Sequence, residues 1–538
     1  MLSFPRSYRH EKANDWRCEA AQARQDAAHE EAQDEVTSRT SKLLGPPGTG
    51  KTTYGLREVH THLKSGTSPA RIAYTAFTRK AAHEAVERAI TQFSFTREDF
   101  PHFGTLHSLA FRLLELTPDR VMTKKHFQDL GERLGPYAFQ GSYDENSERG
   151  HPDGELGDVC LHIHQLHRAM MVSLEEAWRL VQDHPTRYGP PRTGPLPFHV
   201  VEYFSRGLEE YKRQHDLLDF TDFLDKCTSV LDVDLFILDE AQDLTPQQWR
   251  FARQLGRTAK KVLVAADDDQ ALYPWAGADV ELLLRLNGEN LVLPVSHRLP
   301  RAVFNYLQGV ASHIQRRLPK HFSPRDGEGT VRILNNESEV SLLTGEWMLL
   351  ARTNWLTGRL VTTARRAGVV YEHGGMWSNQ DPTVLAVIAY EKLRRGETVI
   401  PAMAKLVARY GKAHIAAPQP HYSWEDFIWP FDGKPYWMDA LVDLGAEQRE
   451  YIRSCLKNKE SLTQPGRVRI STIHQAKGGE CDNVLVLGDM GRRVENSFWA
   501  DMDAELRVWY VALSRAKENL FLVQSQRPSP LQAILAPR

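Results

Sequence analysis

The sequence predicts an α/β protein with two domains, each built on a parallel β-sheet that helices cover on both faces. Three observations support this. Short apolar runs alternate with helical patterns along most of the chain, these runs fall into two groups, and a long stretch without strand character interrupts each group. At 538 residues the chain has room for roughly three or four domains of about 100–200 residues each.

Composition and charge narrow the class of protein. The chain has 67 Lys and Arg against 69 Asp and Glu, which excludes a histone-like basic protein but leaves room for a local basic groove. No apolar run approaches the length of a transmembrane helix, and the first residues lack the apolar core of a secretory signal. The 5 cysteines are scattered without a CxxC pair, so we expect a reducing cytosol and no disulfide framework.

Eight apolar runs bounded by turn residues predict strands. They cover residues 71–77, 233–240, 260–268, 329–334, 347–353, 467–473, 482–489 and 519–524.

The runs and the stretches between them predict the domain boundaries. The expected parts are a polar extension (1–40), a first domain (41–108 and 219–281) with a helical insertion (109–218), and a second domain (282–375 and 463–538) with a short insertion (376–462).

A phosphate-binding loop follows the first short apolar stretch. Residues 45–52 read GPPGTGKT and match G-x-x-x-x-G-K-[ST] in full, with a plausible helix behind them. Glycines let backbone N–H groups point into one cavity at the positive end of a helix. Lys51 would reach the terminal phosphates, and Thr52 would hold Mg²⁺. The predicted nucleotide contacts are Gly45, Pro46, Pro47, Gly48, Thr49, Gly50, Lys51, Thr52 and Thr53.

A second element ends an apolar strand in two carboxylates. In LFILDE, Asp239 would bind Mg²⁺ through water and Glu240 would polarise the attacking water. Both lie where a strand of an open α/β sheet ends, which is where such sheets bind ligands. Together with the loop, this pair predicts nucleotide hydrolysis.

Four segments then occur in a fixed order along the chain: DEAQD (239–243), ADDDQALYPWAGA (266–278), ISTIHQAKGGECDNVLV (470–486) and YVALSRAKE (510–518). The series resembles the motifs of superfamily 1 helicases of the UvrD/Rep/PcrA type. The resemblance implies two RecA-like domains with ATP and Mg²⁺ between them. It also implies that Gln270 senses the γ-phosphate and that Arg298 and Arg515 clamp it when the domains close. Glu480 resembles the glutamate that contacts the ribose.

The same resemblance implies a path for a single strand. Phe77 and Thr78 lie in a segment like the family's motif Ia, and His107 lies in a loop like one that contacts the strand. Aromatic side chains suit this task because every base offers a face for stacking. The implied contacts are Phe77, Thr78, His107, Tyr273, Trp275, Thr472 and His474.

These features predict an ATP-dependent DNA helicase or translocase in the cytoplasm, or in a host cell's cytoplasm if a phage encodes it. It would move 3′ to 5′ on single-stranded DNA and at single-strand/duplex junctions, with replication or repair proteins as partners and no membrane. Two alternatives remain: a single-strand-stimulated ATPase that displaces bound proteins, and an RNA helicase. Two departures from the family are a missing adenine-reading Gln element in residues 20–40 and His297 where a Tyr is usual.

One further group could ligate a metal. In CLHIHQLH, Cys160, His164 and His167 would share a helix face, with His162 beside them. No second ligand pair with zinc spacing follows nearby, so buried or surface histidines are the favoured interpretation.

Overall fold

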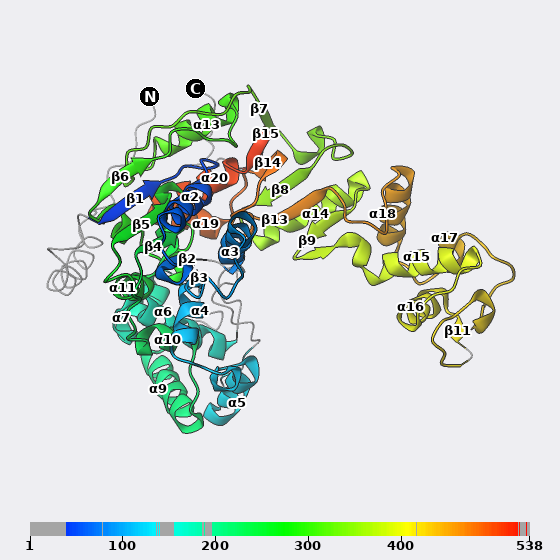
Figure 1. Ribbon diagram of the computed structural model, residues 1–538. Coiled ribbons are helices and arrows are strands. Elements are labelled where there is room, and N and C mark those ends of the chain that lie inside the picture. The colour runs from blue at the N-terminus through cyan, green and yellow to red at the C-terminus, as the bar shows by residue number, and fades with distance from the viewer. Residues whose placement is uncertain are drawn as a thin grey trace.

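The computed structural model describes residues 39–77, 79–135, 155–184, 196–415 and 417–525, with the single residues 137, 139, 188, 527 and 534. Two large sheets with helices on their faces dominate it (Figure 1). This confirms the predicted α/β fold with two parallel-sheet domains. Nearly all of the expected N-terminal extension lies outside the described residues. Among the described helices, none is both long and apolar enough to cross a bilayer.

Six parallel strands form the first sheet in the order β3-β2-β4-β5-β1-β6. Their bounds are β1 (Thr40–Leu44), β2 (Ile72–Ala76), β3 (Phe103–Thr105), β4 (Leu235–Asp239), β5 (Lys261–Ala266) and β6 (Glu289–Val292). Successive side chains of a strand point to opposite faces. Leu235 and Ile237 therefore pack under α2 (Lys51–Lys64) and α3 (Arg79–Phe93), while Phe236 and Leu238 pack on the other face.

Helices α4 (Leu106–Leu113), α10 (Phe220–Lys226), α11 (Pro246–Leu255) and α12 (Val280–Leu284) cover that other face. Since all six strands are parallel, their carboxyl ends share one edge. The phosphate-loop segment, the DEAQD segment and the ADDDQ segment follow β1, β4 and β5 and therefore start at this edge.

The second sheet has seven strands in the order β10-β9-β13-β8-β14-β15-β7, and only the β9–β10 pair is antiparallel. Their bounds are β7 (Thr330–Leu334), β8 (Trp347–Ala351), β9 (Tyr371–His373), β10 (Met376–Trp377), β13 (Val468–Thr472), β14 (Cys481–Leu487) and β15 (Ala516–Val523). One face packs on α14 (Asn354–Ala367). The other packs on α13 (Arg301–Ala311), α19 (Arg492–Ala500) and α20 (Met502–Leu513).

All eight predicted strands are present, as β2, β4, β5, β7, β8, β13, β14 and β15. β6 belongs to the first sheet although it lies beyond residue 281, where that domain was expected to end. Its residues, ENLV, are half-polar and only partly buried because it is an edge strand paired on one side. The chain therefore leaves the first domain after Val292.

The first insertion is helical, as its sequence predicts. Its helices are α5 (Lys124–Leu134), α6 (Leu156–Met170), α7 (Leu174–Asp183) and α9 (Phe198–His215). They share one hydrophobic core, in which Ile163, Val181 and Phe204 are fully buried.

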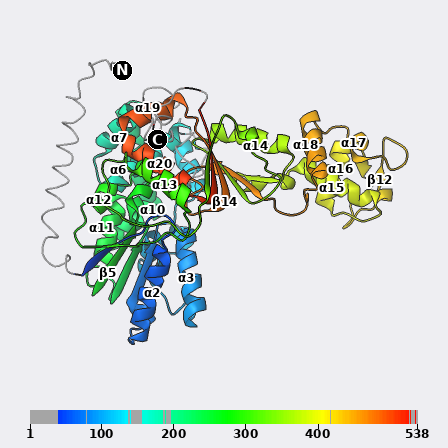
Figure 2. The same ribbon diagram turned by 90° about the horizontal axis from the view of Figure 1, so that it is seen from above.

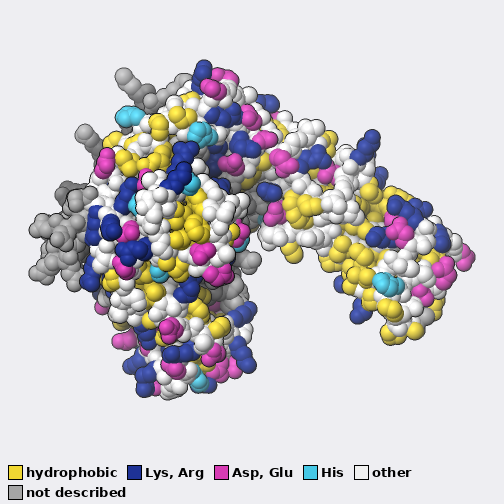
Figure 3. Space-filling view, viewed as in Figure 1, with side chains coloured by type: hydrophobic (Ala, Val, Ile, Leu, Met, Phe, Trp, Pro, Cys, Tyr) yellow, Lys and Arg dark blue, Asp and Glu magenta, His cyan; other side chains and the backbone are white. Residues whose placement is uncertain are grey.

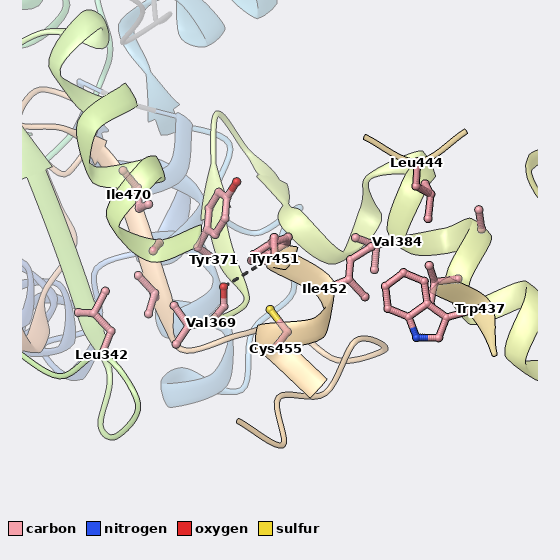
Figure 4. Packing of buried hydrophobic residues seen from close by; sticks show 14 of the residues in the cluster. Leu342, Val369, Tyr371, Val384, Trp437, Leu444, Tyr451, Ile452, Cys455 and Ile470 are labelled. Atoms are coloured by element: carbon pink, nitrogen blue, oxygen red, sulfur yellow. Dashed lines mark hydrogen bonds between the residues drawn. The ribbon is translucent and has the colours of Figure 1, made fainter. Parts of the chain in front are cut away.

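The second insertion forms an arm that projects away from both sheets (Figures 1 and 2). It holds α15 (Pro382–Arg394), α16 (Pro401–Gly411), α17 (Trp437–Ala440), α18 (Ala446–Lys457) and one short antiparallel pair, β11 (His414–Ile415) with β12 (Phe427–Ile428). Its core continues into that of the second domain (Figure 4), where the hydroxyl of Tyr451 donates a 3.1 Å hydrogen bond to the carbonyl of Val369. Because of the β11–β12 pair, the second insertion contains slightly more strand than its sequence suggests.

Candidate functional site

The phosphate loop joins β1 to α2. Gly48 and Gly50 have φ angles of 73° and 83°, in the left-handed region that favours glycine. A Cβ on Gly45 would lie 2.0 Å from Cγ of Lys51, so this position also needs glycine. Gly50 precedes α2 and has no side chain to cap it, which leaves the first N–H groups of the helix available to an anion. The loop therefore has the backbone geometry of a phosphate cradle.

Four side chains converge beside this loop. The Lys51 ammonium donates a 2.9 Å hydrogen bond to the carbonyl of Gly45, and the Thr52 hydroxyl lies 3.3 Å from a carboxylate oxygen of Asp239. The Tyr74 hydroxyl donates a 2.6 Å hydrogen bond to the same oxygen. Burial, reinforced by the charge of Glu240, raises the pKa of Asp239 to about 6. Hydroxyl and carboxylate oxygens are the ligands that Mg²⁺ prefers, so Thr52 and Asp239 fit such an ion.

Glu240 occupies a strained position between two ammonium groups. Its φ of 56° is left-handed, which is unfavourable for a residue with a Cβ and is one way in which strain is stored at functional sites. Its carboxylate lies 3.7 Å from Nζ of Lys51 and 3.9 Å from Nζ of Lys477. Burial alone would raise the pKa of Glu240, but Lys51 and Lys477 outweigh it and lower the pKa. The group is therefore held as an anion beside the phosphate loop.

Arg515 brings the second domain to the same place. Its side chain is 1% exposed, and Nη2 donates a 2.9 Å hydrogen bond to Oε1 of Gln270 in the first domain. The amide of Gln270 in turn donates a 2.6 Å hydrogen bond to Asp267. Burial, and then the charge of Arg298, lowers the pKa of Arg515. A buried guanidinium thus faces the nucleotide site across the domain boundary.

Arg298 lies on a segment that is bound directly to the phosphate loop. The Ser296 hydroxyl donates to the carbonyl of Pro47 at 2.7 Å, and the backbone N–H of His297 donates to Gly48 at 2.8 Å. A Cβ on Gly48 would lie 2.3 Å from Cβ of Arg298. Its guanidinium turns back to its own domain, where Nε lies 2.6 Å from the carboxylate of Glu480. This segment is therefore seated on the loop rather than poised across an open cleft.

Lys477 is a contact that sequence reasoning missed. Its ammonium pairs with Asp243, donates a 2.9 Å hydrogen bond to the carbonyl of Gln270 and lies 5.3 Å from the ring centroid of Tyr273. The sequence could have indicated this residue, because Lys477 lies in the same short segment as His474 and Glu480. Tyr74 and Ser296 were also missed, and nothing in their local sequence marks them.

The aromatic candidates of the first domain form one group. Phe77 stacks on Tyr273 with centroids 5.2 Å apart, and Trp275 meets Tyr273 edge-on at 6.2 Å. Tyr273 is only 5% exposed, whereas Phe77 and Trp275 are half-buried. Phe77 and Trp275 therefore offer the accessible ring surface, with Tyr273 packed between Phe77 and Lys477.

The remaining strand-contacting candidates lie on both domains. His107 begins the first turn of α4 and meets Phe220 edge-on at 6.2 Å. Thr472 ends β13, where its hydroxyl accepts a hydrogen bond from the N–H of Gln475, and the half-buried His474 follows. Thr78 lies outside the described residues.

The three histidines of the candidate metal group on α6 contact other groups of the protein. His162 contacts the carbonyl of Tyr188 at 2.9 Å, His164 the hydroxyl of Ser205 at 2.8 Å, and His167 the carbonyl of Val172 at 3.2 Å. His164 also lies near the carboxylates of Glu209 and Asp219. The ammonium of Lys212 is 2.8 Å from both of those carboxylates, so a cation already sits there.

Two family models match the chain in sequence order. The UvrD/REP helicase N-terminal domain matches residues 26–290, and the UvrD-like helicase C-terminal domain matches residues 449–527. The first match holds the phosphate loop, Glu240 and Gln270, and the second holds Lys477 and Arg515.

Curated proteins give the same family. The ATP-dependent DNA helicase PcrA of Leuconostoc citreum is 23% identical over 53% of this chain but only 39% of its own length. The putative ATP-dependent DNA helicase YjcD of Bacillus subtilis is 20% identical over 89% of this chain and 76% of its own length. A probable DNA helicase of Mycoplasma pneumoniae is 22% identical over 88% and 79%. With both family models matched around one shared site, the chain belongs to the UvrD-like family of superfamily 1 helicases.

Proposed function

We propose that this protein is an ATP-dependent DNA helicase that moves on single-stranded DNA. The observation that carries the proposal is the contact of Arg515 with Gln270 beside Lys51 and Glu240. One nucleotide site is thus built from both domains, so binding and hydrolysis of ATP can change how the domains sit against each other. The names of the relatives, which describe DNA helicases, support DNA as the substrate.

Each side chain at the site has a role in hydrolysis under this proposal. The N–H groups of the loop and Lys51 bind the phosphates, and Thr52 and Asp239 would hold Mg²⁺, which would neutralise phosphate charge when bound. Glu240, held as an anion, orients the attacking water and accepts its proton. Arg515 and Arg298 stabilise the charge that develops on the γ-phosphate. Glu480, exposed next to Arg298, is suited to contact the ribose.

Lys477 links hydrolysis to the strand. Its ammonium touches the acidic group that includes Glu240 and Asp243, and it also faces the ring of Tyr273. A base that stacks near Phe77 and Trp275 would shift Tyr273 and so change the contacts of Lys477. Thr472 and His474 would hold the backbone from the second domain. Closing and opening of the site then alternates the grip of the two domains and moves the protein 3′ to 5′.

The decisive test is unwinding of duplexes that carry a single-stranded tail at either the 3′ or the 5′ end, with and without ATP and Mg²⁺. Separation costs about 1.4 kcal/mol per base-pair step on average, which one hydrolysis event can supply. We expect ATP-dependent separation of the 3′-tailed substrate. Displacement of a bound protein without unwinding would favour the protein-stripping alternative, and stronger ATPase stimulation by RNA than by DNA would favour an RNA helicase.

The matched variants are Lys51→Ala and Lys64→Ala, which make the same change at the two ends of α2. Lys51→Ala should abolish ATPase and unwinding while single-strand binding persists. Lys64→Ala, at an exposed position in the last turn, should leave all three unchanged. Unwinding by Lys51→Ala at the wild-type rate would overturn the assignment of the nucleotide site.

A further inference from the structure

Trp355 is the most exposed of the described large hydrophobic side chains, with 83% of its surface accessible. Tryptophan has a large apolar ring, and leaving it in water forfeits the free energy of burial. The residue belongs to none of the structure's hydrophobic cores, and it is not one of the residues that the nucleotide site uses.

The position of Trp355 is fixed by the second sheet. β8 ends at Ala351, which is paired in register with Thr472 at the end of β13, and the N–H of Ile473 donates to the carbonyl of Ala351 at 3.0 Å. Trp355 follows four residues after Ala351, in the first turn of α14. It therefore lies at the same sheet edge as Thr472 and His474, the candidates for holding the strand.

The support beneath Trp355 is rigid. Arg352 makes two hydrogen bonds of 2.6 and 2.9 Å to the carboxylate of Glu505, and the hydroxyl of Thr353 caps α14 by accepting from the N–H of Leu356. Leu356 and Leu360 anchor the inner face of the helix in the core. An aromatic ring on such a support loses little conformational freedom when a base stacks on it.

The surroundings leave room for a nucleotide. One turn along α14, a Cβ on Gly358 would meet nothing within 4 Å. The first turn of the helix reads NWLT and carries no acidic side chain, while the positive end of a helix favours a phosphate nearby. Figure 3 shows a wide recess between the arm and the rest of the molecule.

We propose that Trp355 is a base-stacking platform by which the second domain holds single-stranded DNA. The inference rests on the proposed function and adds to it a ring on the second domain, matching those that Phe77 and Trp275 offer on the first. Each domain then contacts the strand through its own aromatic side chain, which suits a motor that alternates its hold between two domains. Continuity with Thr472 and His474 is what favours a nucleic acid over a protein at this surface.

The test is the affinity of the full chain for a fluorescein-labelled oligothymidylate, measured by fluorescence anisotropy. Trp355→Ala should bind about 5- to 150-fold more weakly, the range expected for loss of one stacked base. Trp355→Phe should recover most of that loss because it keeps an aromatic face. Both variants should keep the wild-type dependence of affinity on salt, since no phosphate contact is removed.

Two controls separate this inference from the proposed function. Tyr203→Ala removes a ring that is 46% exposed on α9, in the first insertion, and should bind as wild type does. Oligothymidylates with one abasic site moved along the strand should show one position that weakens wild type but not Trp355→Ala. If wild type binds and Trp355→Ala binds equally well, the inference is wrong and the helicase proposal stands. If wild type fails to bind single-stranded DNA at all, the helicase proposal itself fails.

Discussion

The nucleotide site and the first insertion each bury a group of charged side chains, but the two groups are balanced differently. Where the insertion meets α10 of the first domain, the ammonium of Lys212 lies 2.8 Å from carboxylate oxygens of Glu209, Asp219 and Asp222. Arg168 adds contacts of 2.8 Å to Asp222 and 2.7 Å to Asp225. In the nucleotide site, the ion pairs that Glu240 makes within the described part of the chain are longer, at 3.7 Å to Lys51 and 3.9 Å to Lys477.

The pKa values of the carboxyl groups show the consequence. In the insertion, burial opposes ionisation, yet His164 and Lys212 bring the pKa of Glu209 to about 2, and Lys212 and Arg168 hold that of Asp219 low. In the site, burial raises the pKa of Asp239 and of Asp243 to about 6, while that of Glu240 is lowered. Neighbouring carboxyl groups with opposed shifts are typical of sites that bind or transfer charge. The carboxylates of the first group are paired with cations of the protein itself, whereas the nucleotide site reaches charge balance only when its ligand is bound.

The largest effect should come from removing Arg515. Arg515→Ala takes away the guanidinium that we propose stabilises the γ-phosphate, and such groups contribute about 10³–10⁵ in rate in related phosphoryl-transfer enzymes. We expect a loss of ATPase turnover of that size with little change in single-strand binding, measured by steady-state kinetics and anisotropy. Arg301→Ala, at an exposed position in the same domain, serves as the control. A loss of less than tenfold would show that Arg515 only supports the domain contact.

Glu240→Gln should have the next largest effect. The amide keeps the shape of the side chain but can neither accept the proton of the attacking water nor carry charge, so turnover should fall by about 10²–10⁴-fold while ATP still binds. Glu480→Gln is the matched control: it makes the same change at a half-exposed side chain, and we expect it to raise KM a few-fold and leave kcat nearly unchanged. Equal kinetic effects of the two variants would remove the distinction between a base and a binding residue.

Site residues and strands that lie in contiguous apolar segments could be predicted from the sequence. The phosphate loop, Asp239 and Glu240 come from contiguous segments at the ends of apolar strands, so a local pattern locates them. Seven of the eight predicted strands likewise lie inside a sheet, with a neighbour on each side, and carry apolar runs; the eighth, β7, is an edge strand that its alternating apolar residues still mark. β3, β6 and β9 to β12 are short or lie at edges, and they are held by backbone pairing that leaves little periodic signal.

Contacts between distant segments could not be predicted from local sequence patterns. Tyr74 meets Asp239 across 165 residues of chain, and Lys477 meets Asp243 across 234. Nothing local distinguishes Tyr74 from any other aromatic residue of a buried strand. Lys212 and Asp219 are only 7 residues apart, but that pair becomes part of a buried cluster only when Arg168 is brought in from α6. Folding decides which charges meet, and sequence spacing alone does not.

Replacing a lysine by methionine should have opposite effects in the two charged groups: on stability in the group around Lys212, and on activity in the nucleotide site. Lys212→Met leaves Glu209, Asp219 and Asp222 without their shared ammonium, and unpairing a buried charge costs about 3–5 kcal/mol. Hydrogen exchange should therefore speed up in α6, α9 and α10 but stay unchanged in α2. Lys51→Met should abolish ATPase yet change exchange little, because Gln242 and Lys477 still contact Glu240. Comparable exchange in the two variants would contradict the contrast between a structural and a functional group.

The smallest effect is a pH dependence confined to the insertion. Burial lowers the pKa of His162 and of His167 to about 4, against 6.5 for the unperturbed side chain. Between these values the unfolded insertion binds protons that the folded one does not, so its stability is full above pH 6.5 and falls as the pH drops toward 4. Near pH 5 each histidine should cost about 2 kcal/mol, since each pKa unit is worth about 1.4 kcal/mol.

Hydrogen exchange of the α6 amides at neutral pH and at about pH 5, corrected for the intrinsic rate, measures this loss. His162→Gln should shrink it, because glutamine does not titrate and can still donate to the carbonyl of Tyr188. The α2 amides provide the internal reference, since α2 lies outside the insertion. Equal protection of α6 at both pH values would show that burial of these two histidines in the neutral form does not contribute to the stability of the insertion.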